Sequence, residues 1–175
     1  MSGIVGLLGA LLLVGVVLFL AVTTFNSVVS LRQQIDKAWA NIDVALQQRH
    51  DELPRLVDAV RGVMAYERDT FEAVTAARAA YDRSQPIPAQ AVTSARTTAA
   101  VAQLLNVVER YPELRSQQNV LELQHEIERL EGVIADRREV YNDSVYRFNT
   151  RIRTFPTNIL GWFLGWQPRP FFSAP

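Results

Sequence analysis

Residues Ile4 to Val22 read IVGLLGALLLVGVVLFLAV. The run carries no charged side chain and is almost wholly apolar. As a helix it would extend for about 28 Å, because each residue adds about 1.5 Å, and that length is close to the thickness of a bilayer's hydrocarbon core. The run therefore predicts a single membrane-spanning helix that includes Ile4, Leu12, Phe19 and Val22.

The alternative for an apolar N-terminal run is a cleaved secretory signal. Such a signal has a basic segment, an apolar core of about 7 to 15 residues and a small-x-small cleavage site. Met1 to Gly3 carry no charged side chain, the apolar run is longer than a signal core, and no Ala-x-Ala sequence follows it. We therefore expect the helix to stay in the mature protein as an anchor.

Basic residues flank only one end of this span. The first charged residue of the chain is Arg32, and Lys37 and Arg49 follow it. Lysine and arginine close to a span favour the cytoplasmic side of the membrane. We therefore expect a single-pass protein of the cell inner (cytoplasmic) membrane, with its N-terminus outside and its soluble domain in the cytoplasm.

The composition of the whole chain argues against several classes of function. Lysine and arginine number 18, as do aspartate and glutamate, so the formal charge is zero. No global basic field is then available to attract nucleic-acid phosphates. The chain has no cysteine, which removes disulfides, thiolate metal ligands and a thiol nucleophile.

From Val28 onward, apolar residues recur every three or four positions, which is the spacing of one helix face. The pattern predicts a helix that continues out of the anchor, a second helix from about Pro54 to Tyr81 and a third from Ala89 to Arg110. A long fourth helix is expected to open with a capping box at Asn119 to Glu122 and to stop before Pro156. No segment alternates with period two, so the predicted fold class is all-α, with the N-terminal transmembrane helix followed by an antiparallel four-helix bundle of long helices.

The segment before Pro54 leaves two alternatives open. Pro54 can lie in the first turn of a new helix with Asp51 as its N-cap, or it can kink a continuous helix. A new helix gives four antiparallel legs and returns Phe155 to the membrane. A continuous helix gives three legs and leaves the tail far from the bilayer.

The C-terminal segment is rich in aromatic residues, among them Trp162, Phe163, Trp166, Phe171 and Phe172. Exposed in water, such a segment would be an aggregation hazard, and tryptophan is favoured at the headgroup level of a membrane. We expect these five residues to contact the membrane interface or a partner. The expected domain organisation is thus an anchor over 1–27, a helical bundle over 28–156 and an aromatic tail over 157–175.

Several motifs resemble the signature of the LemA family. They are Leu31-Arg32-x-x-Ile35-Asp36-x-Ala38-Trp39-x-x-Ile42-Asp43-Val44-x-Leu46-x-x-Arg49-His50-Asp51-x-Leu53-Pro54-x-Leu56-Val57, Tyr111-Pro112-x-Leu114, Leu123-Gln124, Arg137-Arg138-x-x-Tyr141-Asn142-Asp143, Asn149-Thr150 and Phe155-Pro156. The similarity covers nearly the whole chain in order. It implies a cytoplasmic-membrane protein with one N-terminal span, an extracytoplasmic N-terminus and an antiparallel four-helix bundle, and it implies no reaction.

Polar side chains offer few candidates for chemistry. His50 and His125 lack a histidine partner at i, i+4, and isolated histidines are more often surface residues than metal ligands. The sequence has one Glu-x-x-His, from Glu122 to His125, but not the repeat of this motif that di-iron bundles use. We therefore expect no catalytic residue, no metal site and no cofactor. A heptad assignment places Arg49 and Glu131 at helix seams, where they are a candidate pair for fixing helix register.

These observations favour a non-enzymatic, membrane-anchored scaffold or adaptor of the LemA type. Such a protein would organise membrane proteins or assemble with itself as an oligomer, through coiled-coil-like helix contacts. The alternative is a membrane-shaping or remodelling protein that acts as an oligomer. The expected partners are the lipid bilayer and other copies or other membrane proteins, with no nucleic acid and no small-molecule substrate.

Overall fold

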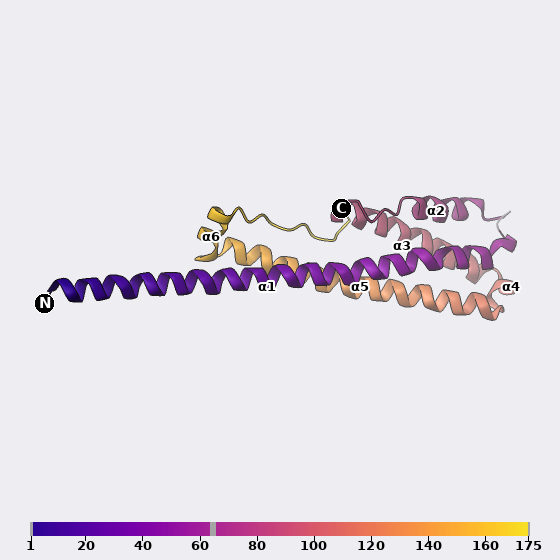
Figure 1. Ribbon diagram of the computed structural model, residues 1–175. Helices are drawn as coiled ribbons and strands as arrows, with labels where there is room; N and C mark the ends of the chain where they lie inside the picture. The colour runs from indigo at the N-terminus through magenta and orange to yellow at the C-terminus, as the bar shows by residue number, and fades with distance from the viewer. Residues whose placement is uncertain (1, 64–65, 175) are drawn as a thin grey trace. The chain divides into compact units, whose positions relative to one another are not determined.

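The computed structural model describes residues 2–63 and 66–174, and nearly all of its elements are α-helices (Figure 1). In chain order they are α1 (Ser2–Ala59), the 3-10 helix η1 (Arg61–Val63), α2 (Arg68–Ala79), α3 (Ile87–Arg110), α4 (Pro112–Arg115), α5 (Gln118–Arg153) and α6 (Thr157–Leu164). No strand occurs in the described ranges, so the all-α class is confirmed. The antiparallel order of a four-helix bundle stays a prediction.

The chain divides into two compact units. The anchor unit combines Met1–Lys37 with Asp143–Arg169, and the core unit combines Ala38–Asn142 with Pro170–Pro175. Each unit therefore contains one part of α1 and one part of α5. The expected domain ranges, which were drawn from composition, stay a prediction.

Helix α1 passes through Pro54 and ends at Ala59. Of the two alternatives for Pro54, the new helix is therefore wrong and the continuous helix holds. The predicted second helix over 54–81 is also wrong in its bounds, because its described residues divide between α1, η1 and α2. The continuous helix nevertheless does not give the three legs that were expected from it, because α2 follows α1 as a separate helix.

Burial explains why α1 continues past its proline. A proline inside a helix costs about 3 kcal/mol, because it lacks an N–H group and its ring clashes with the preceding turn. Leu53 and Leu56 in α1, and Val60 directly after it, are almost completely buried. Each such side chain contributes about 1.5–3 kcal/mol when it leaves water, so together they outweigh the cost of Pro54.

The hydrophobic core of the core unit draws on α1, α2, α3, α4 and α5. Its buried members are Leu53, Leu56, Val60, Phe71, Val74, Ala77, Ala100, Val101, Leu104, Val107, Val108, Leu114, Val120 and Ile127. Helices α2 and α3 lie side by side, as Figure 1 shows. Fully buried residues of α5 outside this cluster are Leu130 and Tyr141 in the core unit and Val145 in the anchor unit.

Two features near the chain's last helices differ from expectation. Helix α5 begins at Gln118, so Asn119 lies inside its first turn and the predicted capping box is wrong. Helix α6 had no predicted counterpart. It ends at Leu164, and its C-cap Gly165 has a φ of 65°, in the left-handed region that favours glycine. The Trp166 N–H donates to the Gly161 carbonyl at 3.0 Å and closes the helix end.

The predicted span lies in the first part of α1, within the anchor unit. Its most apolar window has a mean hydropathy of 3.0, and none of that window is buried. The chosen residues Ile4, Leu12, Phe19 and Val22 are all exposed. One helix in the described part of the chain is therefore long and apolar enough to cross a membrane, which indicates a membrane anchor.

Candidate functional site

The guanidinium group of Arg49 lies inside the core unit, and only 3% of the residue is exposed. Its Nη1 donates to Glu131 Oε1 at 2.7 Å and to Thr98 Oγ1 at 3.0 Å. Its Nη2 donates to Ser94 Oγ at 3.0 Å. The Thr98 hydroxyl in turn donates to the second carboxylate oxygen of Glu131 at 2.8 Å. The network therefore joins α1, α3 and α5.

This polar network matches the needs of a charge that has left water. A buried guanidinium is stable only when an opposite charge and further hydrogen bonds satisfy it. Glu131 supplies the charge, and the hydroxyls of Ser94 and Thr98 supply the remaining acceptors. The two residues of the candidate register pair are thus in contact, and a role in fixing register stays a prediction.

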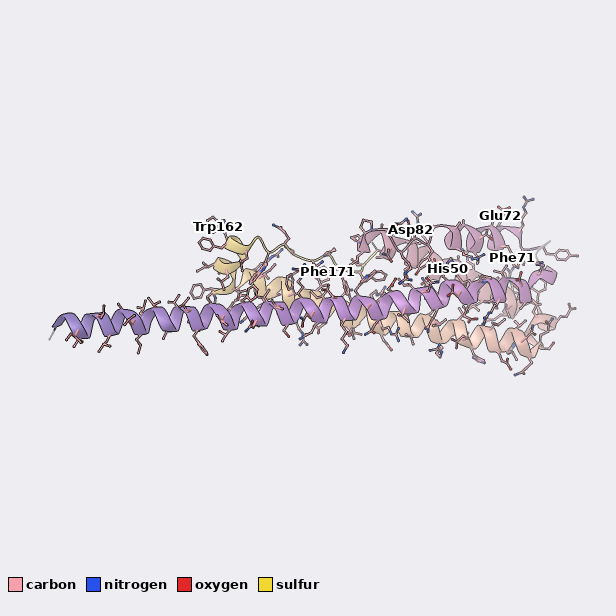
Figure 2. All side chains as sticks on the ribbon, in the orientation of Figure 1. His50, Phe71, Glu72, Asp82, Trp162 and Phe171 are labelled. Atoms are coloured by element: carbon pink, nitrogen blue, oxygen red, sulfur yellow. The ribbon has the colours of Figure 1, made fainter. Side chains whose placement is uncertain are left out.

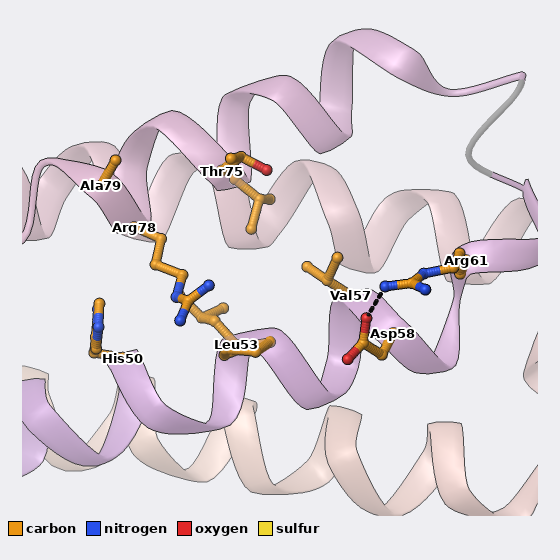
Figure 3. Close-up of a pocket in the computed structure, with 10 residues that line it drawn as sticks. His50, Leu53, Val57, Asp58, Arg61, Thr75, Arg78 and Ala79 are labelled. Carbon is orange, nitrogen blue, oxygen red and sulfur yellow. Dashed lines mark hydrogen bonds and ion pairs between the residues drawn. The ribbon is translucent and has the colours of Figure 1, made fainter.

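A cavity of about 520 Å³ opens between α1 and α2 in the core unit (Figure 3). Its lining residues are His50, Leu53, Pro54, Val57, Asp58, Arg61, Val74, Thr75, Arg78 and Ala79. Figure 3 shows the Arg78 side chain reaching from α2 into this space, while Arg61 pairs with Asp58 at 2.6 Å. The cavity therefore combines an apolar wall with cationic groups, and none of the predicted site residues lines it.

His50 lies at one end of this cavity and stacks on Tyr81, with 4.7 Å between the ring centroids. Burial lowers the pKa of His50, the nearby Arg78 cation lowers it further, and Asp51 acts in the opposite direction. Burial also raises the pKa of the Tyr81 hydroxyl. Both shifts therefore favour the neutral forms of the two rings. Among the described residues, no group of histidine and carboxylate side chains is arranged to hold a metal ion.

Large apolar side chains of α6 remain exposed within the anchor unit. Trp162 is 79% exposed and Phe163 is 72% exposed, and their rings contact each other edge to face at 4.7 Å. Figure 2 shows Trp162 projecting away from the α6 ribbon. Trp166 packs instead against Phe25, at 6.2 Å between ring centroids. Phe25 follows the predicted span by three residues, so α6 is linked to the part of α1 directly after that span.

The end of the tail behaves differently, because it packs against the core unit. Phe172 is 2% exposed, and its ring centroid lies 5.8 Å from that of Trp39. Its N–H donates to Asn142 Oδ1 at 2.8 Å, and its carbonyl accepts from Asn142 Nδ2 at 3.2 Å. The Tyr141 hydroxyl donates to the carbonyl of Pro170 at 2.9 Å. We call Trp39, Tyr141 and Asn142 the tail seat.

The five predicted aromatic contact residues therefore do not form one cluster. Trp162, Phe163 and Trp166 belong to the anchor unit, whereas Phe171 and Phe172 belong to the core unit. Phe171 is exposed, while Phe172 is buried by the protein itself. The tail seat was absent from the candidate residues, because helical periodicity does not indicate which side chains contact the tail.

Comparison with known proteins gives a family and two distant relatives. The LemA family model matches residues 38–175, which is most of the chain and excludes the predicted span. The magnetosome proteins MamQ 1 and MamQ 2 of Paramagnetospirillum magneticum are each 31% identical to this chain over 74 residues. That segment is 42% of this chain and only 27% of each relative, so the similarity spans about a quarter of their length.

Proposed function

The chain belongs to the LemA family, and from that premise we propose that it is a membrane-anchored, non-enzymatic scaffold or adaptor that organises membrane proteins or assembles with itself. The family is not a known enzyme family. The buried charges of the core unit are paired with protein groups, which supports a structural use for them. The weak similarity to proteins named for the magnetosome also supports a role at a membrane.

One observation carries most of this proposal, namely the exposed aromatic face of α6 in the anchor unit. Trp162 and Phe163 are among the most exposed large apolar residues of the described chain, and exposed apolar patches mark membrane or protein contacts. The contact between Trp166 and Phe25 connects α6 to the membrane-leaving part of α1. The proposed contacts of this face are the headgroup region of the bilayer and the flanks of neighbouring membrane proteins, both of which favour tryptophan.

The proposed location is the inner (cytoplasmic) membrane, with the N-terminus outside and the core unit in the cytoplasm. Arg32 and Lys37 support this orientation, since they follow the span at its C-terminal side. The absence of cysteine permits a clean test with Gln117→Cys, an exposed position before α5. An impermeant thiol reagent is expected to label this variant only after the cells are opened, and labelling of intact cells would reverse the topology.

A photoreactive amino acid at Phe163 of the full-length protein tests the scaffold function. After illumination of native membranes, mass spectrometry is expected to find other copies of the chain or a reproducible set of membrane proteins. The same probe at Tyr66, an exposed position of the core unit, is the control and should not capture the same set. Adducts with lipid alone at position 163 would overturn the scaffold proposal.

A second candidate function is membrane shaping by an oligomer. The exposed apolar side chains of α6 favour it, because a short helix that inserts one face into the headgroup region can bend a bilayer. This function requires regular assemblies on lipid, which electron cryomicroscopy of reconstituted vesicles would reveal. Vesicles that stay spherical and show no ordered coat at high protein density would leave only the scaffold.

A further inference from the structure

The tail seat recognises its segment in the way that peptide-binding domains recognise extended peptides. Asn142 bonds both backbone groups of Phe172, so it fixes the position of the chain without reading a side chain. Trp39 contacts the Phe172 ring and thereby selects an aromatic residue at that position. Main-chain bonds combined with a side-chain pocket are the usual division of labour in peptide recognition.

The segment that occupies the seat is suited to binding as a separate ligand. Residues 165–170 form no helix, and Pro168 and Pro170 restrict the backbone to extended conformations. A segment that is already extended loses little conformational entropy when it binds. It is connected to α6 through Gly165, whose left-handed conformation ends the helix. Asn149 bonds the N–H and the carbonyl of Arg169 in the anchor unit, so the part of the tail that can exchange while this contact is kept begins at Pro170.

Open space remains beside the docked tail, on the side of α3. A cavity of about 500 Å³ in the core unit is lined by Phe172 and Ala174 of the tail, together with residues of α3 and α5 such as Ala95, Thr98 and Ala135. The bound tail therefore borders open space. An incoming segment can make its first contacts there before the resident tail has left.

We propose that the tail seat also accepts the Pro170–Ala174 segment of a second copy of the chain, so that neighbouring copies exchange tails. Every contact made within one chain can be made identically by a second copy, because the segment and the seat have the same sequence in both. Exchange of an identical element is a low-cost route to association. The inference rests on the proposed membrane anchoring. A tail tethered to its own seat has an effective concentration of ~mM, and confinement of the copies to one bilayer raises the local concentration of the neighbouring tails that compete with it.

The cysteine-free chain allows a direct test in vesicles of phosphatidylethanolamine and phosphatidylglycerol. One full-length copy, the acceptor, carries Ala95→Cys and Phe172→Ala, which weakens its own tail. The other copy, the donor, carries Ala174→Cys, so a short bismaleimide joins the two only when the donor tail occupies the acceptor seat. We expect a crosslinked dimer in the mixture and in neither copy alone. A chain with both Ala95→Cys and Ala174→Cys is the control for docking within one copy.

The seat is tested by adding Asn142→Ala to the acceptor. Loss of two hydrogen bonds is expected to lower the dimer yield by about fivefold or more, because each contributes at least about 0.5 kcal/mol net. Asn106→Ala, at an exposed position of α3, is the matched control and should leave the yield unchanged. Crosslinking within the double-cysteine chain without any dimer in the mixture would overturn tail exchange.

A synthetic peptide of residues 166–175 gives a second measurement that does not depend on Phe172→Ala folding correctly. In this arm the acceptor carries only Ala95→Cys, and the donor is unchanged. The peptide is expected to compete the dimer away, whereas the same peptide with alanine at position 172 should not, and equal yields with both peptides would count against the seat. Flotation of the vesicles reports anchoring separately, so tail exchange can fail while the proposed anchoring stands.

Discussion

The two parts of the aromatic tail have similar side chains and opposite environments. In α6, Trp162 and Phe163 are exposed, whereas Phe172 is buried in the tail seat. The difference follows from local partners, because Asn142 and Trp39 give Phe172 both backbone hydrogen bonds and a ring contact. The core unit thus buries Phe172 with its own groups, while α6 of the anchor unit presents apolar surface that requires another solvent or a partner.

The largest effect is expected from Arg49→Ala, which attacks the interior side of this comparison. The substitution leaves the Glu131 carboxylate in the network without its cation, and loss of one partner of a buried pair costs about 3–5 kcal/mol. Urea unfolding of the full chain in mild detergent, followed by far-ultraviolet circular dichroism, measures the change. Arg55→Ala is the matched control, because Arg55 forms an exposed pair with Glu52 and its loss should cost less than about 1 kcal/mol.

A double substitution separates net stability from register. Replacing both Arg49 and Glu131 by methionine removes both charges, and such replacements are often close to neutral. We expect this variant to be more stable than Arg49→Ala, with a less specific helix packing that broadens its unfolding transition. If the double variant and Arg49→Ala were destabilised equally, the loss of the pair itself, and not the unpaired Glu131 charge, would account for most of the change in unfolding free energy.

The next largest effect is expected from Phe172→Ala. In a closed core this change costs about 3–5 kcal/mol. The tail can instead undock while the rest of the core unit stays folded, so the loss of stability cannot exceed the free energy of docking the tail. We therefore expect less than about 3 kcal/mol in global stability and a large rise in hydrogen exchange at residues 169–174. Phe171→Ala, at the exposed neighbour, should change neither. Unaltered exchange in Phe172→Ala would show that the ring does not hold the tail.

Helical periodicity predicted the fold class because burial and amphipathic spacing are local in sequence. The stripes around Ile42, Leu46 and Leu130 are buried as their spacing predicts. The position of the first turn stayed open, because Pro54 alone does not show whether the apolar residues that follow it continue the same helix. Gly62 and the break in the stripe between Val63 and Phe71 were the available signals for a later turn.

The tail seat could not be derived from composition, since aromatic content alone does not distinguish a bilayer from a protein groove. A signal was nevertheless present in spacing. Asn149 bonds the N–H and carbonyl of Arg169 within the anchor unit, as Asn142 does for Phe172 within the core unit. Seven helical residues advance about 10.5 Å and three extended residues about 9–10 Å, so two asparagines a heptad apart match an extended segment beside them.

A smaller effect on stability, with a large effect on lipid contact, is expected from Trp162→Ala combined with Phe163→Ala. Exposed side chains contribute little to folding, so the free energy of unfolding should change by less than about 0.5 kcal/mol. Quenching by lipid-borne quenchers, measured in a Trp39→Phe background, is expected for the parent and reduced in the variant. If the remaining Trp166 were quenched efficiently in the variant, and the variant bound the lipid as the parent does, the membrane contact would be assigned to Trp166 alone.

The smallest effect on stability is expected from protonation of His50. Its side chain is partly buried, and is thus intermediate between the buried Phe172 and the exposed Trp162. Burial and the Arg78 cation lower the pKa of His50 in the folded state, and Asp51 opposes them only in part. The unfolded chain keeps the ordinary histidine pKa of about 6.5, so below that value the unfolded state binds more protons than the folded state. The stability that comes from a neutral His50 is therefore complete above about pH 6.5 and declines as the pH falls below it.

His50→Gln should flatten the change in unfolding free energy between about pH 7 and 5, while His125→Gln, at the exposed histidine of α5, should leave that change in place. If both variants kept the parental slope, the stacking of His50 on Tyr81 would have no protonation linkage, and the slope would belong to the carboxylates alone.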